Sequence, residues 1–563
     1  MRWTIKPKPD SSKVARLSKE LAVDSTTSFL LVQRGIETFK EAKNFFRPDL
    51  NDLHDPFLMK DMEKAVSRIE DAVKNQEKIL VYGDYDVDGT TSVALMSSYI
   101  LSFYPNVATY IPDRYEEGYG ISYKGIDFAE DNNFSLIIAL DCGIKAIEKV
   151  TYATKKGVDF IICDHHRPGN EIPKAKAVLD PKQEDCKYPF KELCGCGVGF
   201  KLIQALASKK GATINDLVRY LDLVATAIGA DIVPIVGENR ILAYHGLKVI
   251  NENPRPGFEA ILKQVKKEKL TITDVVFIIA PRINAAGRMK HGNHAVTLLC
   301  ETDINLAAEY AIDIDTYNTN RQDADKRITI EALTQIEENE EQDRFTSVVY
   351  DENWHKGVIG IVASRLTETY YRPTLVFTKS GEMLAASARS VKGFDVYNAL
   401  EKCSEYIEQF GGHKYAAGLT LKPEKYKDFK AQFEKVVKET IDQQMLIPEI
   451  AIDTEISLSD ITPKFYRILS QFAPFGPGNM TPVFMSEDLN DTGFGKQVGE
   501  DKTHLRCTAI QFGKGKIAGI GFGLGDQLEF IKNKKLFKAA YTIDENEWNG
   551  NVSLQLKIKD IKP

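Results

Sequence analysis

The 563-residue sequence predicts a multidomain α/β protein with a parallel-sheet domain, linker helices, a second α/β domain and a C-terminal β-barrel of the OB type. Three observations support this fold class. Continuous apolar runs separated by helix-length segments fill the first half and are typical of βαβ units. The same alternation of strand and helix patterns resumes at Thr346, and short, turn-separated strands follow Ile447.

Shifts in composition divide the chain into five segments, because 563 residues exceed what one hydrophobic core supports. The first segment is polar and helical, the Pro-rich stretch 251–257 ends the first α/β domain, and the acidic run 336–343 precedes the second. The expected segments are an N-terminal extension (1–55), the parallel-sheet domain (56–255), a helical connector (256–345), the second α/β domain (346–442) and the barrel (447–563).

The composition is that of an ordinary globular protein, with 43% hydrophobic and 27% charged residues. A net charge of −7 means that any nucleic-acid surface must be local. The chain has no apolar run of about 18 residues and no apolar signal core at its start, so we expect a cytoplasmic protein without membrane contact. Eight scattered cysteines indicate reduced, mostly buried thiols, and Cys194 and Cys196 lack a second pair for a zinc site.

Carboxyl-rich clusters follow three predicted strands and one predicted helix. The strands 78–82, 135–140 and 158–163 lead into GDYDVDG, DCG and DHH, and a helical pattern leads into GADIVP. Because the carboxyl ends of parallel strands form one edge of a sheet, we expect these side chains to converge on one cleft. They are Asp84, Asp86, Asp88, Asp141, Asp164, His165, His166 and Asp231.

So many acids in one cleft point to bound cations. Two carboxylates about 4 Å apart repel by about 4 kcal/mol at an effective dielectric near 20, so several would not stay ionised together. Oxygen ligands with some imidazole suit manganese or magnesium better than zinc. Four carboxylates would balance two divalent ions, and such ion pairs are the usual apparatus of phosphodiester hydrolysis.

A simpler interpretation exists for each cluster taken alone. An aspartate after a strand is often the N-cap of the next helix, and Asp88 before Gly89 could be only that. The adjacent His165 and His166 after Asp164 are harder to explain in this way, because two imidazoles in a polar turn have no packing purpose. The four clusters together therefore favour a metal centre.

These residues occur in a familiar order. GDYDVDGTTS, LDCGI, CDHH and GADIVPIVGENR resemble the four motifs of the DHH phosphoesterase superfamily, and FGGHKYAAGL resembles the glycine-rich signature of its associated domain. PRINAAGRM, WHKGVIGIVASRL, ASARS and FGPGNMTPVF are similar to segments of the RecJ family of exonucleases within that superfamily. The resemblance covers about residues 45–563.

The resemblance implies roles for the clustered residues. Asp141 would bridge two divalent cations, Mn²⁺ or Mg²⁺, and Asp84 would be a ligand or a partner of one. Asp164 would orient the imidazoles, and His166 would face the scissile phosphate. The implied direct ligands are Asp86, Asp88, Asp141, His165 and Asp231.

The resemblance also assigns substrate binding to the second α/β domain. Ser387, Arg389 and Ser390 offer donors for a phosphate, and arginine grips a terminal phosphate with two parallel hydrogen bonds. Gly412 would let backbone N–H groups approach closely, and His413 would add a donor. From the residues alone, a surface turn for the arginine and a helix start for the glycines are equally consistent.

Two further segments carry basic residues. Arg282 and Arg288 lie in a stretch too polar for a core helix, and either contact the nucleic acid near its entry or pair with acids. In the barrel, Phe475, Phe484 and Tyr541 are expected in the core rather than as stacking platforms. A basic strip, or merely a solvated strand, is expected at Lys532, Lys534, Lys535 and Lys538.

The resemblance predicts a metal-dependent exonuclease that degrades single-stranded DNA in the 5′ to 3′ direction to mononucleotides, in recombination and repair. Single-strand-binding protein and a helicase are the implied protein partners. A phosphodiesterase acting on short oligoribonucleotides or cyclic dinucleotides is an alternative, but such enzymes usually end soon after the glycine-rich domain. A non-catalytic nucleic-acid scaffold is disfavoured, since every acidic and histidine position of the motifs is present.

Overall fold

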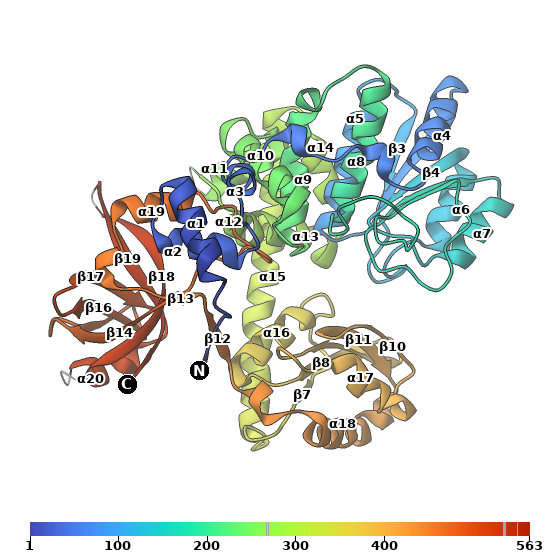
Figure 1. Ribbon diagram of the computed structural model, residues 1–563. Coiled ribbons are helices and arrows are strands. Elements are labelled where there is room, and N and C mark those ends of the chain that lie inside the picture. The colour runs from blue at the N-terminus through green and yellow to red at the C-terminus, as the bar shows by residue number, and fades with distance from the viewer. Residues whose placement is uncertain (266, 268, 533–535, 549) are drawn as a thin grey trace. The chain divides into compact units, whose positions relative to one another are not determined.

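The computed structural model describes residues 1–563 except 266, 268, 533–535 and 549 (Figure 1). The chain forms two compact units. One unit comprises Trp3–Pro281, Ala295–Ala308 and Ile450–Pro563, and the other comprises Met1–Arg2, Arg282–His294 and Glu309–Glu449. Within the described residues, no helix has both the length and the apolar character needed to cross a membrane.

The first unit contains a five-stranded parallel sheet in the order β3-β2-β4-β5-β6. Its three central strands are the apolar runs that precede the first three acid clusters, so the predicted parallel sheet is confirmed. Each of these strands is buried almost throughout, as expected for a sheet covered on both faces. The strands are β2 (Lys78–Gly83), β3 (Val107–Tyr110), β4 (Phe134–Leu140), β5 (Asp159–Cys163) and β6 (Ala177–Leu179).

Helices cover the two faces of this sheet. Side chains on one face, such as Leu80 and Phe160, pack against Ile126 of α6 and Val150 of α7. Helices α5 and α8 lie on the opposite side from α6 and α7 (Figure 1). The helices of this region are α4 (Met62–Lys74), α5 (Val87–Leu101), α6 (Tyr123–Asp131), α7 (Ile147–Lys155), α8 (Gly195–Lys209), α9 (Leu221–Ala230) and α10 (Gly237–Glu252).

The connecting segment is helical, as predicted. A π-helix at Val275–Ile279 joins two of its helices, and the long helix α15 ends before the second sheet begins. The helices are α11 (Pro256–Val265), α12 (Ile272–Asp274), α13 (Ala280–Met289), α14 (Asn293–Cys300) and α15 (Ile304–Glu338).

The second unit contains a mixed sheet in the order β10-β11-β9-β8-β7, in which only β7 and β8 pair in parallel. One face packs against α17 and α18 through residues such as Ala386 and Phe429, and the other packs against α16. The elements are β7 (Ser347–Tyr350), α16 (Ile359–Tyr370), β8 (Thr374–Ser380), β9 (Met383–Arg389), α17 (Val396–Glu401), β10 (Gln409–His413), β11 (Ala416–Leu421) and α18 (Tyr426–Thr440).

The C-terminal region is the predicted barrel. Its sheet runs β13-β14-β18-β19-β17-β16-β15, and an additional pairing of β14 with β16 closes it. The strands are β13 (Thr454–Glu455), β14 (Phe484–Asp491), β15 (Lys496–Val498), β16 (His504–Gln511), β17 (Gly515–Gly521), β18 (Phe537–Trp548) and β19 (Asn551–Lys562), with helices α19 (Pro463–Ser470) and α20 (Leu528–Lys532).

The N-terminal helices belong to the core of this barrel. Leu17, Leu30 and Ala42 are buried together with Phe465, Phe484 and other barrel residues. The first strand also pairs with the segment that enters the barrel, which the sequence did not predict. These elements are β1 (Arg2–Ile5), α1 (Ser11–Leu21), α2 (Ser25–Gln33), α3 (Phe39–Phe46) and β12 (Glu449–Ile452).

Candidate active site

The first acid cluster occupies the turn between β2 and α5. Asp86, not Asp88, is the N-cap of α5, where its carboxylate accepts a hydrogen bond of 2.9 Å from Gly89 N. A Cβ atom on Gly89 would lie 2.3 Å from the Asp84 carbonyl oxygen, so only glycine lets the helix start this close to the strand. The N-cap explanation therefore holds for one acid of the three and leaves the other two for another purpose.

Asp88 is held by a second helix. It is 2% exposed, and its two carboxylate oxygens accept 2.7 Å hydrogen bonds from the backbone N–H groups of Gly195 and Cys196, at the start of α8. Backbone N–H groups at a helix N-terminus favour a negative charge. The position of Asp88 is thus fixed by the backbone rather than by a cationic side chain.

Asp141 follows β4 and has a left-handed backbone, with φ of 59°. Its N–H donates to the Cys163 carbonyl at 2.8 Å, which ties it to the end of β5. A Cβ on Gly195 would lie 2.5 Å from the Cβ of Asp141, so the glycine at the start of α8 is needed for this approach. An unfavoured backbone conformation of a buried aspartate is typical of a functional site.

The DHH segment follows β5. Asp164 accepts hydrogen bonds from Ile144 N at 2.8 Å, from His165 N at 2.7 Å and from His166 Nδ1, also at 2.7 Å. Burial alone would raise the pKa of Asp164, but its hydrogen bond and ion pair with His166 lower it to about 2. Burial lowers the pKa of His166, but the same contacts with Asp164 outweigh it and raise that pKa to about 9. Asp164 and His166 therefore form an anchored pair.

His165 lies at the centre of the acids. Its Nε2 is 3.2 Å from Asp141 Oδ1, 3.6 Å from Asp231 Oδ2 and 3.8 Å from Asp88 Oδ2. Burial, with the charge of His166, lowers the pKa of His165 to about 3, so the imidazole is neutral. Two groups have ligand atoms within 4.8 Å of one another: Asp141, His165 and His166, and Asp88, His165 and Asp231.

The electrostatics of this cluster fit divalent cations. Burial, followed by the charge of neighbouring carboxylates, raises the pKa of Asp84, Asp88 and Asp141 well above the usual value. The same causes raise the pKa of Asp231 to about 7. Carboxylates and a neutral imidazole are a donor set for Mn²⁺ or Mg²⁺, and such ions would remove the repulsion between the acids.

Three residues near these acids escaped the sequence analysis. Tyr119 Oη lies 3.2 Å from His166 Nε2, and the Arg114 guanidinium lies 4.5 Å from the centre of the Tyr85 ring. Asp180 directly follows β6 and is fully buried, and burial raises its pKa to about 7. The short apolar run 177–179 before Asp180 was a usable signal, since it matches the strands before the other clusters. Tyr119 lies in a loop and had no such signal.

The second unit carries the predicted phosphate-binding residues on its sheet. Arg389 donates to Ser387 Oγ at 3.0 Å and to the Ala388 carbonyl at 2.7 Å. A Cβ on Gly360 would lie 3.0 Å from Ser387 Oγ and 3.1 Å from Arg389 Nη2, which places the first turn of α16 beside both. The helix N-terminus and the guanidinium therefore present positive charge at one place.

The glycine-rich signature forms the hairpin β10–β11, not a helix start. In register, His413 pairs with Ala416 and Ala416 with Arg389, so the three lie on one face of the sheet. His413 is exposed, and Gly412 has a φ of 144° that favours glycine. Ser390 differs from the expected donor, because its hydroxyl donates to the Phe394 carbonyl of its own loop at 3.1 Å.

Three of the remaining basic residues predicted to contact DNA have protein partners, namely Arg282, Arg288 and Lys538. Arg282 forms hydrogen bonds of 2.9 and 2.8 Å with Asp315, and Arg288 donates to the Gly357 carbonyl at 2.7 Å. In the barrel, Lys538 pairs with Glu487 at 2.7 Å, Lys532 is exposed, and Lys534 and Lys535 lie outside the described residues.

Two structural expectations for buried residues are met. Phe484 and Tyr541 are fully buried in the barrel core, and Phe475 packs against it partly buried. All eight cysteines are free thiols, and seven of them are buried.

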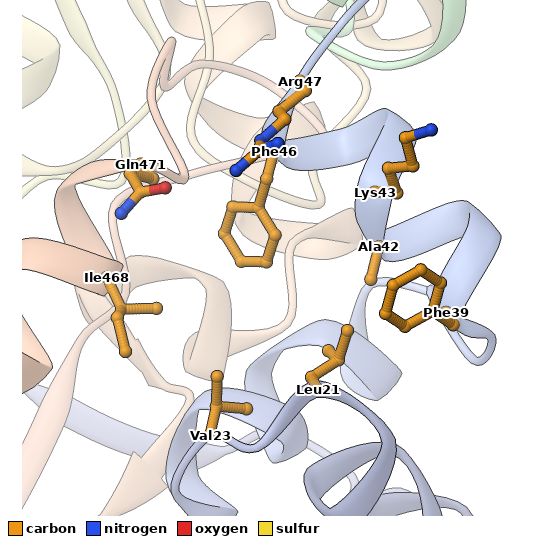
Figure 2. Close-up of a pocket in the computed structure, with 9 residues that line it drawn as sticks. All are labelled: Leu21, Val23, Phe39, Ala42, Lys43, Phe46, Arg47, Ile468 and Gln471. Carbon is orange, nitrogen blue, oxygen red and sulfur yellow. The ribbon is translucent and has the colours of Figure 1, made fainter.

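A cavity of about 470 Å³ lies away from the acids (Figure 2). It is formed by the turn after α1, helix α3 and helix α19, and its wall is mainly apolar. Lys43 and Arg47 are the cationic side chains at it. The cavity contains none of the candidate catalytic residues. It is lined by Leu21, Val23, Phe39, Ala42, Lys43, Phe46, Arg47, Ile468 and Gln471.

Comparison with known proteins adds independent information. Family models match residues 78–228 (DHH family, N-terminal domain), 343–439 (DHHA1 domain) and 452–560 (RecJ OB domain). The chain is 37% identical to the single-stranded-DNA-specific exonuclease RecJ of Bacillus subtilis, over 100% of this chain and 70% of that protein. It is 34% identical to the enzyme of the same name from Escherichia coli, over 89% of this chain and 90% of that one.

A solved structure of similar fold is RecJ of Thermus thermophilus in complex with Mn²⁺. The two share 26% sequence identity and superpose with a TM-score of 0.86, over 100% of this chain and 79% of that one.

Proposed function

The chain belongs to the RecJ family of single-stranded-DNA-specific exonucleases, and from this premise we propose that it hydrolyses single-stranded DNA in the 5′ to 3′ direction to mononucleotides at a two-metal centre. The observation that carries the proposal is the neutral, buried His165 within 3.2–3.8 Å of three carboxylates from three different segments. Buried like charges of this kind call for divalent cations, and a Mn²⁺ complex of a relative is known.

The chain's own residues prepare this centre. Two divalent ions held there would activate water and stabilise charge on the attacking and leaving oxygens. Asp86, Asp88, Asp141, His165 and Asp231 are the proposed ligands, with Asp84 beside them. The amides of α8 hold Asp88 at 2.7 Å, so little reorganisation is needed when an ion binds.

His166 is the proposed contact to the scissile phosphate. Asp164 accepts a hydrogen bond from Nδ1 at 2.7 Å, so that Nε2 is the ring nitrogen directed away from Asp164. Tyr119 Oη is 3.2 Å from that atom and marks where a phosphate oxygen would take its place. A proton on Nε2 would then stabilise the charge that develops on the phosphate.

The 5′ polarity rests on the second unit. Arg389, Ser387 and the start of α16 present several donors at one place, beside the exposed strand that carries His413. This arrangement suits a terminal phosphate, which has more charge and more free oxygens than an internal one. Ser390, Gly412, Arg282 and Arg288 complete the proposed set of DNA contacts, although both arginines must exchange or share their present partners.

The cellular setting follows from the substrate. Single-stranded DNA arises during recombination and repair in the cytoplasm of bacteria, and a helicase and single-strand-binding protein are the proposed partners. The barrel supports the exonuclease over a phosphodiesterase for small substrates, since OB folds bind single strands.

The deciding experiment is digestion of end-labelled oligonucleotides. We expect release of mononucleotides from the 5′ end of single strands with Mn²⁺ or Mg²⁺, no release with chelator, and resistance of blunt duplex. Equal digestion from the 3′ end would refute the polarity. Cleavage of only dinucleotides would favour the small-substrate alternative, and binding without cleavage would favour the scaffold.

A further inference from the structure

Asp231 differs from the other proposed ligands in how it is held. Its side chain is 30% exposed, whereas those of Asp88 and Asp141 are 2% exposed. Within the described residues, no N–H or O–H group donates a hydrogen bond to its carboxylate, whose ion pair is with His165 Nε2 at 3.6 Å. The position of this carboxylate therefore depends on the backbone that carries it.

That backbone is irregular after Asp231. Helix α9 ends at Ala230, Ile232 has a left-handed φ of 59°, and α10 begins only at Gly237. Ile235 N donates a hydrogen bond of 2.7 Å to the carbonyl of Pro477, which belongs to the C-terminal region. The segment 231–236, here called the ligand loop, is thus tied to the segment 473–480, here called the barrel loop.

The barrel loop is itself rigidly held. Asn479 is 1% exposed, and its Nδ2 donates to the carbonyls of Phe472 at 2.8 Å and Pro474 at 2.9 Å. Arg34 donates to Asn479 Oδ1 at 3.0 Å and to the Met480 carbonyl at 2.9 Å. Arg240 of α10 donates to the Phe472 carbonyl at 2.8 Å. These hydrogen bonds restrict the conformation of the barrel loop.

In addition to this hydrogen bond, the two loops are in close steric contact. Gly478 has a φ of 76°, and a Cβ there would lie 3.0 Å from Cγ1 of Val236. A Cβ on Gly476 would lie 2.5 Å from Cγ1 of Ile235. A side chain at Gly476 or Gly478 would therefore push the ligand loop.

We propose that the barrel loop is a positioning element for the metal centre: through Pro477, Gly478 and Asn479 it sets the place of the ligand loop and hence of the Asp231 carboxylate. The inference rests on the proposed metal function. It assigns a task to the FGPGN segment, whose side chains supply none of the proposed ligands. It also makes the C-terminal region part of the metal site in addition to its proposed contact with DNA.

Mn²⁺ binding to the full-length protein without DNA tests this proposal. Titration calorimetry with MnCl₂ would compare the wild type with Gly478→Ala and with Gly513→Ala. Gly513 lies in the barrel and has a similar φ of 69°, but a Cβ there would meet open space. Gly513→Ala therefore introduces the same backbone strain as Gly478→Ala without a contact like that with Val236. We expect about tenfold weaker Mn²⁺ binding for Gly478→Ala, the scale at which outer-shell changes act, and unchanged binding for Gly513→Ala.

Two additional variants separate positioning from loss of structure. Val236→Ala combined with Gly478→Ala opens the space at Cγ1 and should restore Mn²⁺ affinity while any change in Tm persists. Arg34→Lys loosens the barrel loop without adding an atom, and should weaken Mn²⁺ binding in the same direction even if Gly478→Ala fails to fold.

The outcomes are distinguishable. Wild-type affinity in both Gly478→Ala and Arg34→Lys overturns the positioning role and leaves the proposed function intact. A double variant that stays as weak as Gly478→Ala also overturns it, because strain at residue 478 would then suffice. A wild-type protein that binds no Mn²⁺ overturns the metal function itself, and the positioning role with it.

Discussion

At the scale of single residues, the candidate metal centre includes Asp141, whose backbone conformation and buried charge are both unfavourable by themselves. Asp141 has a left-handed backbone at φ of 59°, and its buried carboxylate lies among other acids. Both features cost free energy, of the order of 1–3 kcal/mol for such backbone strain. The surrounding contacts hold Asp141 in place, which leaves its carboxylate ready for an ion.

The first prediction concerns this residue. Asp141→Asn retains the shape and tolerates the left-handed backbone, but it removes one charge from the cluster. We expect hydrolysis to fall by more than about a hundredfold, since even outer-shell losses cost about 10- to 100-fold. In chelator the Tm should equal or exceed that of the wild type, because one buried like charge is gone. Oligonucleotide digestion and thermal unfolding measure the two effects, and retained activity would contradict the bridging role.

The second prediction concerns strand polarity. A charge-assisted hydrogen bond contributes about 1.5–3 kcal/mol, or about ten- to a hundredfold in affinity. Arg389→Ala should therefore raise KM for 5′-phosphorylated strands far more than for 5′-hydroxyl strands. Lys392→Ala is the matched control. Lys392 is an exposed cation three residues after Arg389, and it pairs with Glu449. If both variants keep the preference for 5′-phosphate, the pocket has been assigned wrongly.

At the scale of elements, the start of α8 positions two proposed metal ligands, Asp88 and Asp141, at once. Its amides hold Asp88, and the absence of a side chain on Gly195 admits Asp141. A helix N-terminus thus acts here on protein carboxylates as it often does on bound anions. The two acids come from the chain after β2 and after β4, so one helix sets the spacing between two proposed ligands that follow different strands.

The third prediction compares two glycines of this helix. Gly195→Ala places a Cβ 2.5 Å from that of Asp141 and should abolish most of the Mn²⁺ binding and hydrolysis. The nearest neighbours of the Cβ in Gly197→Ala are the side chains of Leu193, at 3.3 Å, and Cys194, at 3.6 Å, neither of which is a proposed ligand, so this variant should retain activity. It should also gain up to about 1 kcal/mol of stability from helix propensity. Calorimetry with MnCl₂ and the Tm of each variant distinguish a specific loss of Mn²⁺ binding from a general loss of stability.

At the scale of the whole molecule, the proposed metal binding should be linked to stability. The acids repel one another in the folded unit but not in the unfolded chain, so a cation that binds only the folded state stabilises it. The gain is about 2.7 kcal/mol when the free ion is at a hundred times its Kd. Because of this linkage, metal binding can be measured as a change in thermal stability, without any DNA.

The fourth prediction follows from this linkage. Scanning calorimetry should show the transition of the unit that contains Trp3–Pro281 at higher temperature in MnCl₂ than in chelator. The transition of the other unit should not move. Asp141→Asn should lose most of the shift, and an equal shift in that variant would mean that Mn²⁺ acts elsewhere.

The sequence predicted the parts of the fold that have local signatures. The strands before the acid clusters, the helix before Asp231 and the barrel strands were predicted because apolar periodicity is a local property. The resemblance to the RecJ family, drawn from short motifs, is confirmed over the length of the chain. The glycine-rich hairpin was left open, since Gly-Gly pairs serve hairpins and helix starts alike.

Other features lie beyond such signals. The pairing of β1 with β12 joins residues separated by more than 440 positions. The four-residue sequence of β1 does not indicate with which strand it pairs. The contact of Tyr119 with His166 and the hydrogen bonds of Arg282 and Arg288 likewise depend on the tertiary structure. The role of each metal ligand stays a prediction until metal binding is measured.

The shared core of the N-terminal helices and the barrel has a consequence for synthesis. Leu17, Leu30 and Ala42 are synthesised long before the barrel residues that bury them, from Ile456 onward. At about 5–20 residues per second, the helices wait of the order of half a minute or more with their apolar faces uncovered. Nascent chains should therefore engage chaperones through the helices α1–α3, and a protein truncated before the barrel should aggregate.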